Sequence, residues 1–279
     1  MNSHLKRVYE QTIEIYRADE RIVAAWEYGS IGKGTADQYS DVDPVFVVKD
    51  DHFADIDREM EGLFKSLSPE IVLWWPESMN CDEIKNYAIF LKKDGCLSQY
   101  DNTIATVKSV RNGMGRFMLT QCGKVEILFD KIGLLSPILQ EEPHPQYTPE
   151  KLLWHIERYW IYVYIHIKYL MRGDPFKLLY AQRELFNDHM AILNALYPHE
   201  YWSWWVVSAR HALNPSQQEA VLRYFGPGDA PAVAHALRQE IDDFSRDAQA
   251  ACRAWGLSYP LRTESEVRAS LLPVLQRLG

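Results

Sequence analysis

Residues 28–43 read Tyr-Gly-Ser-Ile-Gly-Lys-Gly-Thr-Ala-Asp-Gln-Tyr-Ser-Asp-Val-Asp, and the fold of the first half of the chain is predicted from this stretch outward. A mostly apolar run of strand length, residues 21–28, leads into it, and a second run, residues 45–48, follows it. Two short apolar runs separated by a glycine-rich polar segment are typical of two strands joined by a tight connection. The stretch therefore predicts a turn at the edge of a sheet.

Asp41 and Asp43 flank one valine at the start of the second predicted strand. Side chains two residues apart in a strand share a face and lie about 6.6 Å apart. Two carboxylates at that separation repel by about 2.5 kcal/mol at an effective dielectric near 20, and a divalent cation between them turns the repulsion into attraction. The pair is therefore a predicted metal site.

Gly29 and Ser30 close the first predicted strand with residues suited to binding an anion. Gly29 permits a tight turn, and a short helix starting near Ser30 would point free N–H groups and a hydroxyl at a phosphate. Lys33 could pair with a triphosphate as a point charge. These features predict a site for a metal–nucleoside triphosphate; the alternative is a glycine-rich surface turn followed by an aspartate pair that caps a strand or helix.

The motif Gly29-Ser30, followed after a ten-residue spacer by Asp41-Val42-Asp43, resembles the signature of the polymerase-β-type nucleotidyltransferases. The longer run from Asp19 to Asp41 is most similar to the lincosamide nucleotidyltransferases. The aminoglycoside nucleotidyltransferases rank second in similarity. The match is strong only near the N-terminus. It becomes weak in the second half, where it includes residues 170–174.

The resemblance implies a third carboxylate, assigned to Glu126 because this acid lies in an otherwise apolar run at residues 124–129, as in the aminoglycoside enzymes. Catalysis and metal binding are thus predicted at Asp41, Asp43 and Glu126. A solvent-facing position for Glu126 is the alternative from alternation alone. The segment that carries the proposed base in lincosamide enzymes corresponds here to residues 113–117, which contain no acid.

The same resemblance implies a Mg²⁺-dependent nucleotidyltransferase, an enzyme that moves a nucleoside monophosphate from ATP or another nucleoside triphosphate to a hydroxyl of a small molecule. A lincosamide or aminoglycoside antibiotic is the acceptor that it suggests, and hence a role in antibiotic resistance. Nucleotide binding is predicted at the following residues: Gly29, Ser30, Lys33 and Ser40. The alternative is a catalytically silent nucleotidyltransferase-like module that binds a nucleotide or a partner protein, as in some toxin–antitoxin pairs.

Length, charge and cysteine content limit the number of domains, the kinds of binding partner and the compartment that are expected. A chain of 279 residues with 47% hydrophobic content is long enough for two ordinary domains. The net charge of −8 argues against an extended nucleic-acid-binding surface. Four cysteines without a CxxC pair predict neither a zinc ribbon nor a disulfide framework. Because no signal peptide or membrane span is evident, a cytoplasmic protein without membrane contacts is expected, and a homodimer is left open.

The fold class predicted for residues 1–135 is α/β (α+β), a nucleotidyltransferase domain with a mixed sheet. Helices are expected at 4–18 and 50–67, a third strand at 71–75, and a hairpin made by 116–121 and 124–129. The segment 76–111 is left open between strand and helix. The aromatic pair Trp74-Trp75 is interpreted as core packing, without a binding role.

An all-α helical bundle is predicted for residues 147–279, after a proline-rich linker at 133–146. Thr148-Pro149-Glu150 supplies an N-cap, a proline at the first helical position and an acid in the first turn, so a long helix is expected from there to about Met171. Further helices are expected in five segments: 176–196, 200–213, 216–225, 231–255 and 264–278.

Overall fold

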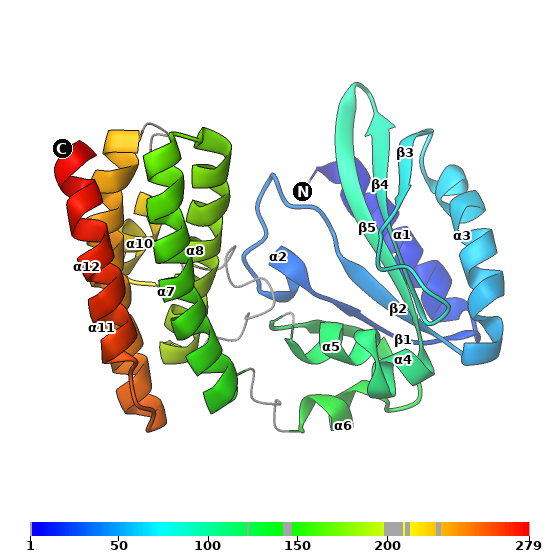
Figure 1. Cartoon of the computed structure of the whole chain (residues 1–279). Helices are drawn as coiled ribbons and strands as arrows, with labels where there is room; N and C mark the ends of the chain where they lie inside the picture. Colours follow the sequence, from blue (N-terminus) through cyan, green and yellow to red (C-terminus); the bar gives the residue numbers. More distant parts are fainter. Residues whose placement is uncertain are drawn as a thin grey trace. The chain divides into compact units, whose positions relative to one another are not determined.

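The structure is a computed structural model that describes residues 2–121, 123–141, 147–197, 209, 213–226 and 230–278 (Figure 1). The chain divides into two compact units. The first unit holds the elements from α1 to α6, and the second holds those from α7 to α12. The predicted helix at 200–213 lies almost entirely outside the described residues.

A six-stranded sheet forms the centre of the first unit, with the strand order β3-β4-β5-β2-β1-β6. Its strands are β1 (Ile22–Glu27), β2 (Pro44–Val48), β3 (Glu70–Pro76), β4 (Ile84–Lys93), β5 (Cys96–Thr106) and β6 (Glu126–Asp130). β2 and β5 pair in parallel, whereas the other neighbours are antiparallel. The prediction of a mixed sheet within an α+β fold is confirmed.

β1 and β2 lie in the interior of the sheet because they are apolar on both faces. Every residue of both strands is buried. Pro44 is the first residue of β2, where a missing N–H leaves only one ladder bond unmade. Glu27 pairs with Pro44, so the residues that immediately precede β2 lie beside the end of β1.

Helices cover both faces of the sheet (Figure 1). They are α1 (Ser3–Ala18), α2 (Gly29–Gly32), α3 (Phe53–Leu67), α4 (Val107–Asn112), α5 (Met114–Gln121) and α6 (Leu135–Leu139), with the 3₁₀ turn η1 (Asp50–His52). α1 and α3 pack on one face, where Phe46 and Tyr100 belong to the shared core. α4, α5 and α6 pack on the other face, over β1, β2 and the adjoining ends of β4 and β5.

The predicted hairpin at 116–129 is wrong in its first half. Residues Met114–Gln121 form α5, and only the second half, β6, is a strand. A helix buries Met118 and Leu119 together against the sheet. Gly115 allows the close approach of α5 to α4, since a Cβ at this residue would lie 3.0 Å from Val110 Cγ2. Tertiary packing therefore outweighs the local strand preference.

The second unit is built from helices around its own hydrophobic core. They are α7 (Pro149–Arg172), α8 (Pro175–Leu196), α10 (Pro215–Leu222), α11 (Ala230–Trp255) and α12 (Leu261–Leu278), with the 3₁₀ turn η3 (Arg223–Phe225). α7 begins as predicted, because the side chain of Thr148 accepts a hydrogen bond from the N–H of Lys151. It ends at Gly173, which has φ of 60°.

Two further expectations from the sequence concern the linker between the two units and the absence of a membrane-spanning helix. The predicted linker 133–146 contains the short helix α6, and its residues 142–146 lie outside the described part of the chain. Among the described residues, no helix combines the length and the apolar character that crossing a bilayer requires.

Candidate active site

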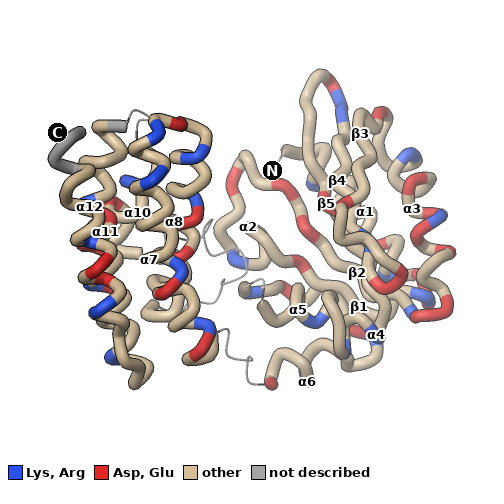
Figure 2. The backbone as a smooth tube through the Cα atoms, viewed as in Figure 1, with Lys and Arg blue, Asp and Glu red and all other residues tan. Residues whose placement is uncertain are grey.

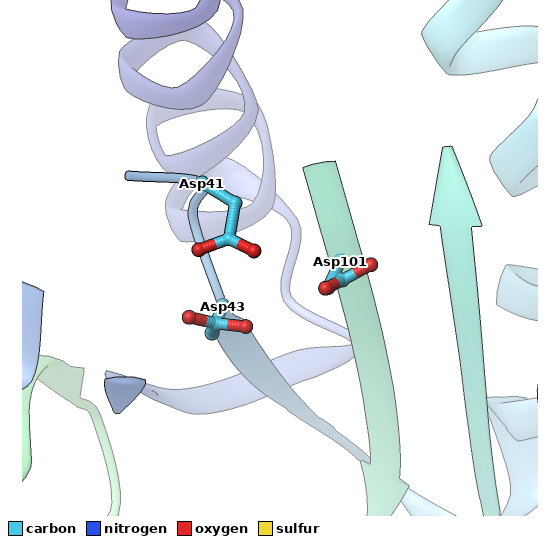
Figure 3. Close-up of side chains that lie close together, drawn as sticks. All are labelled: Asp41, Asp43 and Asp101. Carbon is cyan, nitrogen blue, oxygen red and sulfur yellow. The ribbon is translucent and has the colours of Figure 1, made fainter. Parts of the chain in front are cut away.

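Three aspartates converge at the N-terminal end of β2. Asp41 and Asp43 immediately precede this strand, and Asp101 lies in the neighbouring strand β5. Each carboxyl contributes one oxygen to a group in which all three oxygens lie within 4.8 Å of one another. Figure 3 shows the three side chains directed toward a common space. Figure 2 shows acidic residues along the segment between α2 and β2.

The parallel pairing of β2 with β5 brings Asp101 to the two earlier aspartates. Val45 pairs with Thr103, so the same register places residue 43 beside residue 101. The N–H of Asp101 also donates a hydrogen bond of 2.9 Å to the carbonyl of Val42. Backbone pairing therefore fixes the relative position of the acids without requiring a favourable contact between their charges.

Asp101, rather than Glu126, supplies the third carboxylate of this group. Glu126 begins β6, which pairs with β1, and its cross-strand partner is Glu27. β1 therefore lies between β6 and the strand that follows Asp43. Among the described residues Glu126 is therefore not one of the three clustered acids, and a catalytic or metal-binding role for it stays a prediction.

The chain did carry a signal for β5, and hence for Asp101. Lys93 pairs with Cys96 across the two-residue loop Asp94-Gly95, in which both residues have positive φ, 52° and 80°. Asp-Gly between apolar strands is typical of a tight hairpin. Recognition of this hairpin makes the preceding and following segments the long strands β4 and β5, and it places an acid in the middle of β5.

The carboxylates destabilise one another's charges in the absence of a cation. Burial, followed by the charges of Asp41 and Asp101, raises the pKa of Asp43 to about 8, while Lys33 acts in the opposite direction. Burial also raises the pKa of Asp101 to about 6, against a hydrogen bond from Gln99. A group of acids that resists ionisation by itself is electrostatically prepared for a positive ligand.

The donor set fits a hard divalent cation. All three side chains offer oxygen, the ligand type that Mg²⁺ and Mn²⁺ prefer. Asp101 Oδ2 accepts a hydrogen bond of 2.9 Å from Gln99 Nε2. Asp101 Oδ1 is buried and has no hydrogen-bond partner within the described part of the chain. An orphaned carboxylate oxygen beside two other carboxylates needs a partner from outside the protein, either a cation or the hydrogen of a substrate hydroxyl.

Gly29 lies directly against Asp43. A Cβ built on Gly29 would be 2.0 Å from Asp43 Oδ2, and this glycine has φ of +62°. Both the space and the backbone conformation therefore require glycine. Because Gly29 begins α2, the turn predicted at residues 29–30 is packed against the second aspartate.

The other predicted nucleotide-binding residues lie on α2 and on the segment that follows it. Ser30 Oγ is buried without a hydrogen-bond partner among the described residues. Lys33 is half-buried at the end of α2, and its charge acts on Asp43. Ser40 contacts Asp37 instead, since its Oγ accepts from the Asp37 N–H at 2.9 Å. The charge of Lys33 therefore acts on the acidic cluster, Ser30 follows the glycine that packs against Asp43, and Ser40 stabilises the connecting turn.

Glu27 is a buried acid that the sequence analysis did not single out. It ends β1, and its Oε1 accepts a hydrogen bond of 2.5 Å from the backbone N–H of Asp43. Burial raises the pKa of Glu27 to about 9, and the hydroxyl of Tyr9 on α1 interacts with the same carboxyl. An isolated acid that ends a strand was visible in the sequence, but its contact with Asp43 depends on strand pairing.

Comparisons with known proteins give weak similarity. No family model matches the sequence, and no curated protein does. The chain is similar to the crystal structure of an aminoglycoside 6-adenyltransferase from Bacillus subtilis, with 12% identity and a TM-score of 0.42 over 98% of this chain and 99% of that chain. A protein from H. pylori assigned as a nucleotidyltransferase gives 12% identity and a TM-score of 0.29 over 92% and 98%.

Proposed function

We propose that this chain is a nucleotidyltransferase that moves a nucleoside monophosphate from ATP or another nucleoside triphosphate to a hydroxyl of a small molecule. The observation that supports the proposal most strongly is the convergence of Asp41, Asp43 and Asp101 beside the Gly29-Ser30 turn. The sequence motif that joins this turn to the first two aspartates, and its resemblance to nucleotidyltransferases, gives independent support.

Asp41 and Asp43 would hold one or two Mg²⁺ ions, and Asp101 completes the acidic group. When bound, the metal would neutralise charge on the phosphate oxygens and make the α-phosphorus a better electrophile. The raised pKa of Asp43, caused first by burial, means that this carboxyl gains its charge most readily when a cation is present. A cation held by Asp41 and Asp43 would thus also bind the triphosphate.

The phosphate tail would lie on the α2 side of Asp43. The Ser30 hydroxyl, which has no hydrogen-bond partner in the described part of the chain, can donate to a phosphate oxygen, and the Gly29 backbone can approach closely because it has no side chain. Lys33 adds a positive charge at the end of α2. Ser40, through its bonds to Asp37, would hold the connecting segment in place rather than contact the nucleotide.

Asp101 would accept the proton of the acceptor hydroxyl. The hydroxyl oxygen forms a bond to the α-phosphorus, and the bond from that phosphorus to the oxygen bridging the β-phosphate breaks. Pyrophosphate leaves with the electron pair. Gln99 holds Oδ2 of Asp101, so Oδ1 is left to take the proton. A pKa of about 6 suits a base that is mostly ionised at neutral pH.

The acceptor class is inferred from the resemblance and from charge. Lincosamides and aminoglycosides are hydroxylated compounds that carry amines, and a chain with a net charge of −8 attracts cations. Such an activity would confer antibiotic resistance. The acidic balance also disfavours a nucleic acid as the acceptor.

Transfer of label tests the proposal directly. The chain would be incubated with Mg²⁺ and ATP labelled at the α-phosphate, and kanamycin, streptomycin, lincomycin, RNA and a protein mixture would be offered as acceptors. Label on a small molecule, lost in Asp43→Asn, supports the proposal. Tight binding of the nucleotide without transfer to any acceptor would support the silent binding module instead.

A further inference from the structure

A row of side chains extends across the sheet from the acidic cluster. Asp101 on β5 pairs with Ala88 on β4, and Ala88 pairs with Trp75 on β3, the edge strand. Neighbouring strands lie about 4.8 Å apart, so the backbone of Trp75 is about 10 Å from that of Asp101. The small side chain of Ala88 lies between the carboxylate and the indole.

The three side chains share the face of the sheet that is opposite to α1 and α3. Their chain neighbours Trp74, Tyr87 and Tyr100 point toward α3: the rings of Trp74 and Tyr100 lie 5.8 and 4.9 Å from that of Phe64, and the Tyr87 hydroxyl donates to Asp57. Because successive side chains in a strand alternate, Trp75, Ala88 and Asp101 face the other way.

Among the described residues of the first unit, no helix core covers this part of the sheet. α4, α5 and α6 pack over β1, β2 and the adjoining ends of β4 and β5, and their core includes no residue of β3. Trp75 is 48% exposed, unlike Trp74, which packs against the core beneath α3. The interpretation of both tryptophans as core is therefore wrong for Trp75. The exposed indole of Trp75 therefore lies in the same cross-strand row as the carboxylate of Asp101, on the same face of the sheet.

The proposed chemistry decides which substrate can occupy this face. The attacking and leaving oxygens of a phosphoryl transfer lie on opposite sides of the phosphorus. If pyrophosphate leaves toward α2, which follows β1, the acceptor must approach from the other side of β2. That side is occupied by β5, followed by β4 and β3.

We propose that the open face of β3, β4 and β5 is the acceptor subsite, and that Trp75 selects acceptors by stacking on a ring. The inference rests on the proposed function. The small side chain of Ala88 leaves space between Trp75 and Asp101 for a ring. Such a ring would present its hydroxyl to Asp101 and its flat side to Trp75. The adjacent row Gln99, Phe90 and Leu73 borders the same surface, with Leu73 41% exposed. The acceptor class is a hydroxylated compound with at least one flat or chair-shaped ring.

Equilibrium binding to the chain loaded with Mg²⁺ and a nucleotide analogue blocked between the α- and β-phosphates tests the subsite. The probes are kanamycin, streptomycin and lincomycin, each titrated separately. Trp75→Ala is expected to weaken the probe that binds by about tenfold, the loss of one aromatic stacking contact. Trp75→Phe should restore most of the affinity, and Ala88→Leu should block the probe by filling this space.

Two controls separate stacking from damage to the strand. Val72→Ala changes a residue of the same edge strand with similar exposure, 51%, and should leave probe binding unchanged. The affinity for the nucleotide analogue should be unchanged in Trp75→Ala. Loss of that affinity instead would place the nucleobase on Trp75 and overturn the proposal, as would equal binding by wild type and Trp75→Ala or a lack of binding by all three probes.

Measured label transfer separates this inference from the proposed function. Transfer that is indifferent to Trp75→Ala overturns the subsite and leaves the nucleotidyltransferase in place. Binding that depends on Trp75 without any transfer overturns the proposed reaction and leaves Trp75 as part of a ring-binding site with no acceptor role.

Discussion

Asp43 Oδ2 occupies the space that a side chain on residue 29 would need, because a Cβ at Gly29 would be only 2.0 Å from this oxygen. Gly29 and Asp43, at opposite ends of the segment 28–43, are therefore packed against each other. A glycine placed for its backbone freedom also leaves room for a candidate metal ligand, so a single substitution tests whether that ligand matters.

Gly29→Ala should reduce label transfer by about a hundredfold or more, because displacing Asp43 removes a proposed metal ligand. The left-handed backbone adds a stability cost of about 1 kcal/mol. Gly34→Ala is the matched control. Gly34 has φ of +72°, and no atom lies within 4 Å of the position that an added methyl would take, so this variant carries the strain without the clash. Equal activity losses in both variants would mean that backbone strain, not Asp43, explains the effect.

Asp101→Asn and Glu126→Gln distinguish the two candidates for the third carboxylate. Asp101→Asn should lower the rate of transfer by about 10²- to 10⁴-fold, the usual contribution of a general base. Glu126→Gln should change the rate by less than about tenfold, since the strand order separates this acid from the cluster. Steady-state rates at saturating ATP and Mg²⁺ provide the comparison. The reverse ranking would return the catalytic role to Glu126.

The elements with strong helical or strand patterns were predictable from the sequence. The apolar spacing of α1, α3 and α7 reflects burial of one helix face, and the two apolar runs of β1 and β2 reflect burial on both sides. Residues 116–121 were predicted as a strand, yet they form part of α5 because a helix buries Met118 and Leu119 together. Local preference cannot anticipate that packing.

The site was predictable only as far as local sequence determines it. Asp41 and Asp43 follow from one motif and are separated by one residue. Asp101 is 58 residues beyond Asp43 and reaches it through a parallel pairing of β2 with β5. Glu27 meets the Asp43 N–H through the pairing of β1 with β2. Both contacts depend on strand order, which a spacing pattern does not contain.

Glu27→Gln and Glu27→Ala test whether the buried acid positions Asp43. Glutamine keeps a carbonyl oxygen that can accept the Asp43 N–H, so stability and activity should stay close to wild type. Alanine leaves this buried N–H without its acceptor and should cost about 1–3 kcal/mol of the free energy of unfolding. The Mg²⁺ concentration for half-maximal transfer should rise with it. Denaturant unfolding and metal titration of both variants provide the measurement, and a harmful Glu27→Gln would show that its charge is required.

The acidic cluster should make stability depend on pH in a way that Mg²⁺ reverses. Burial raises the pKa of Asp43 to about 8 and that of Asp101 to about 6, both above the usual carboxyl value near 4. The folded chain therefore holds these protons more tightly than the unfolded chain. Their contribution to stability is complete below about pH 4 and is lost as the pH rises through about 6 to 8.

With a chelator present, this contribution should lower the melting temperature between about pH 6 and pH 8.5. Mg²⁺ binds the deprotonated carboxylates, so the rise in melting temperature that it causes should be larger at about pH 8.5 than at about pH 6. Asp43→Asn should remove most of that rise. Two other buried acids also favour folding at low pH: Glu27, whose pKa burial raises to about 9, and Glu240 in the second unit, whose pKa burial raises to about 8. Glu240→Gln is therefore the control: it should flatten the chelator curve and leave the Mg²⁺ effect intact. A Mg²⁺ effect that is equal at both pH values, or unchanged in Asp43→Asn, would rule out this cluster as the metal site.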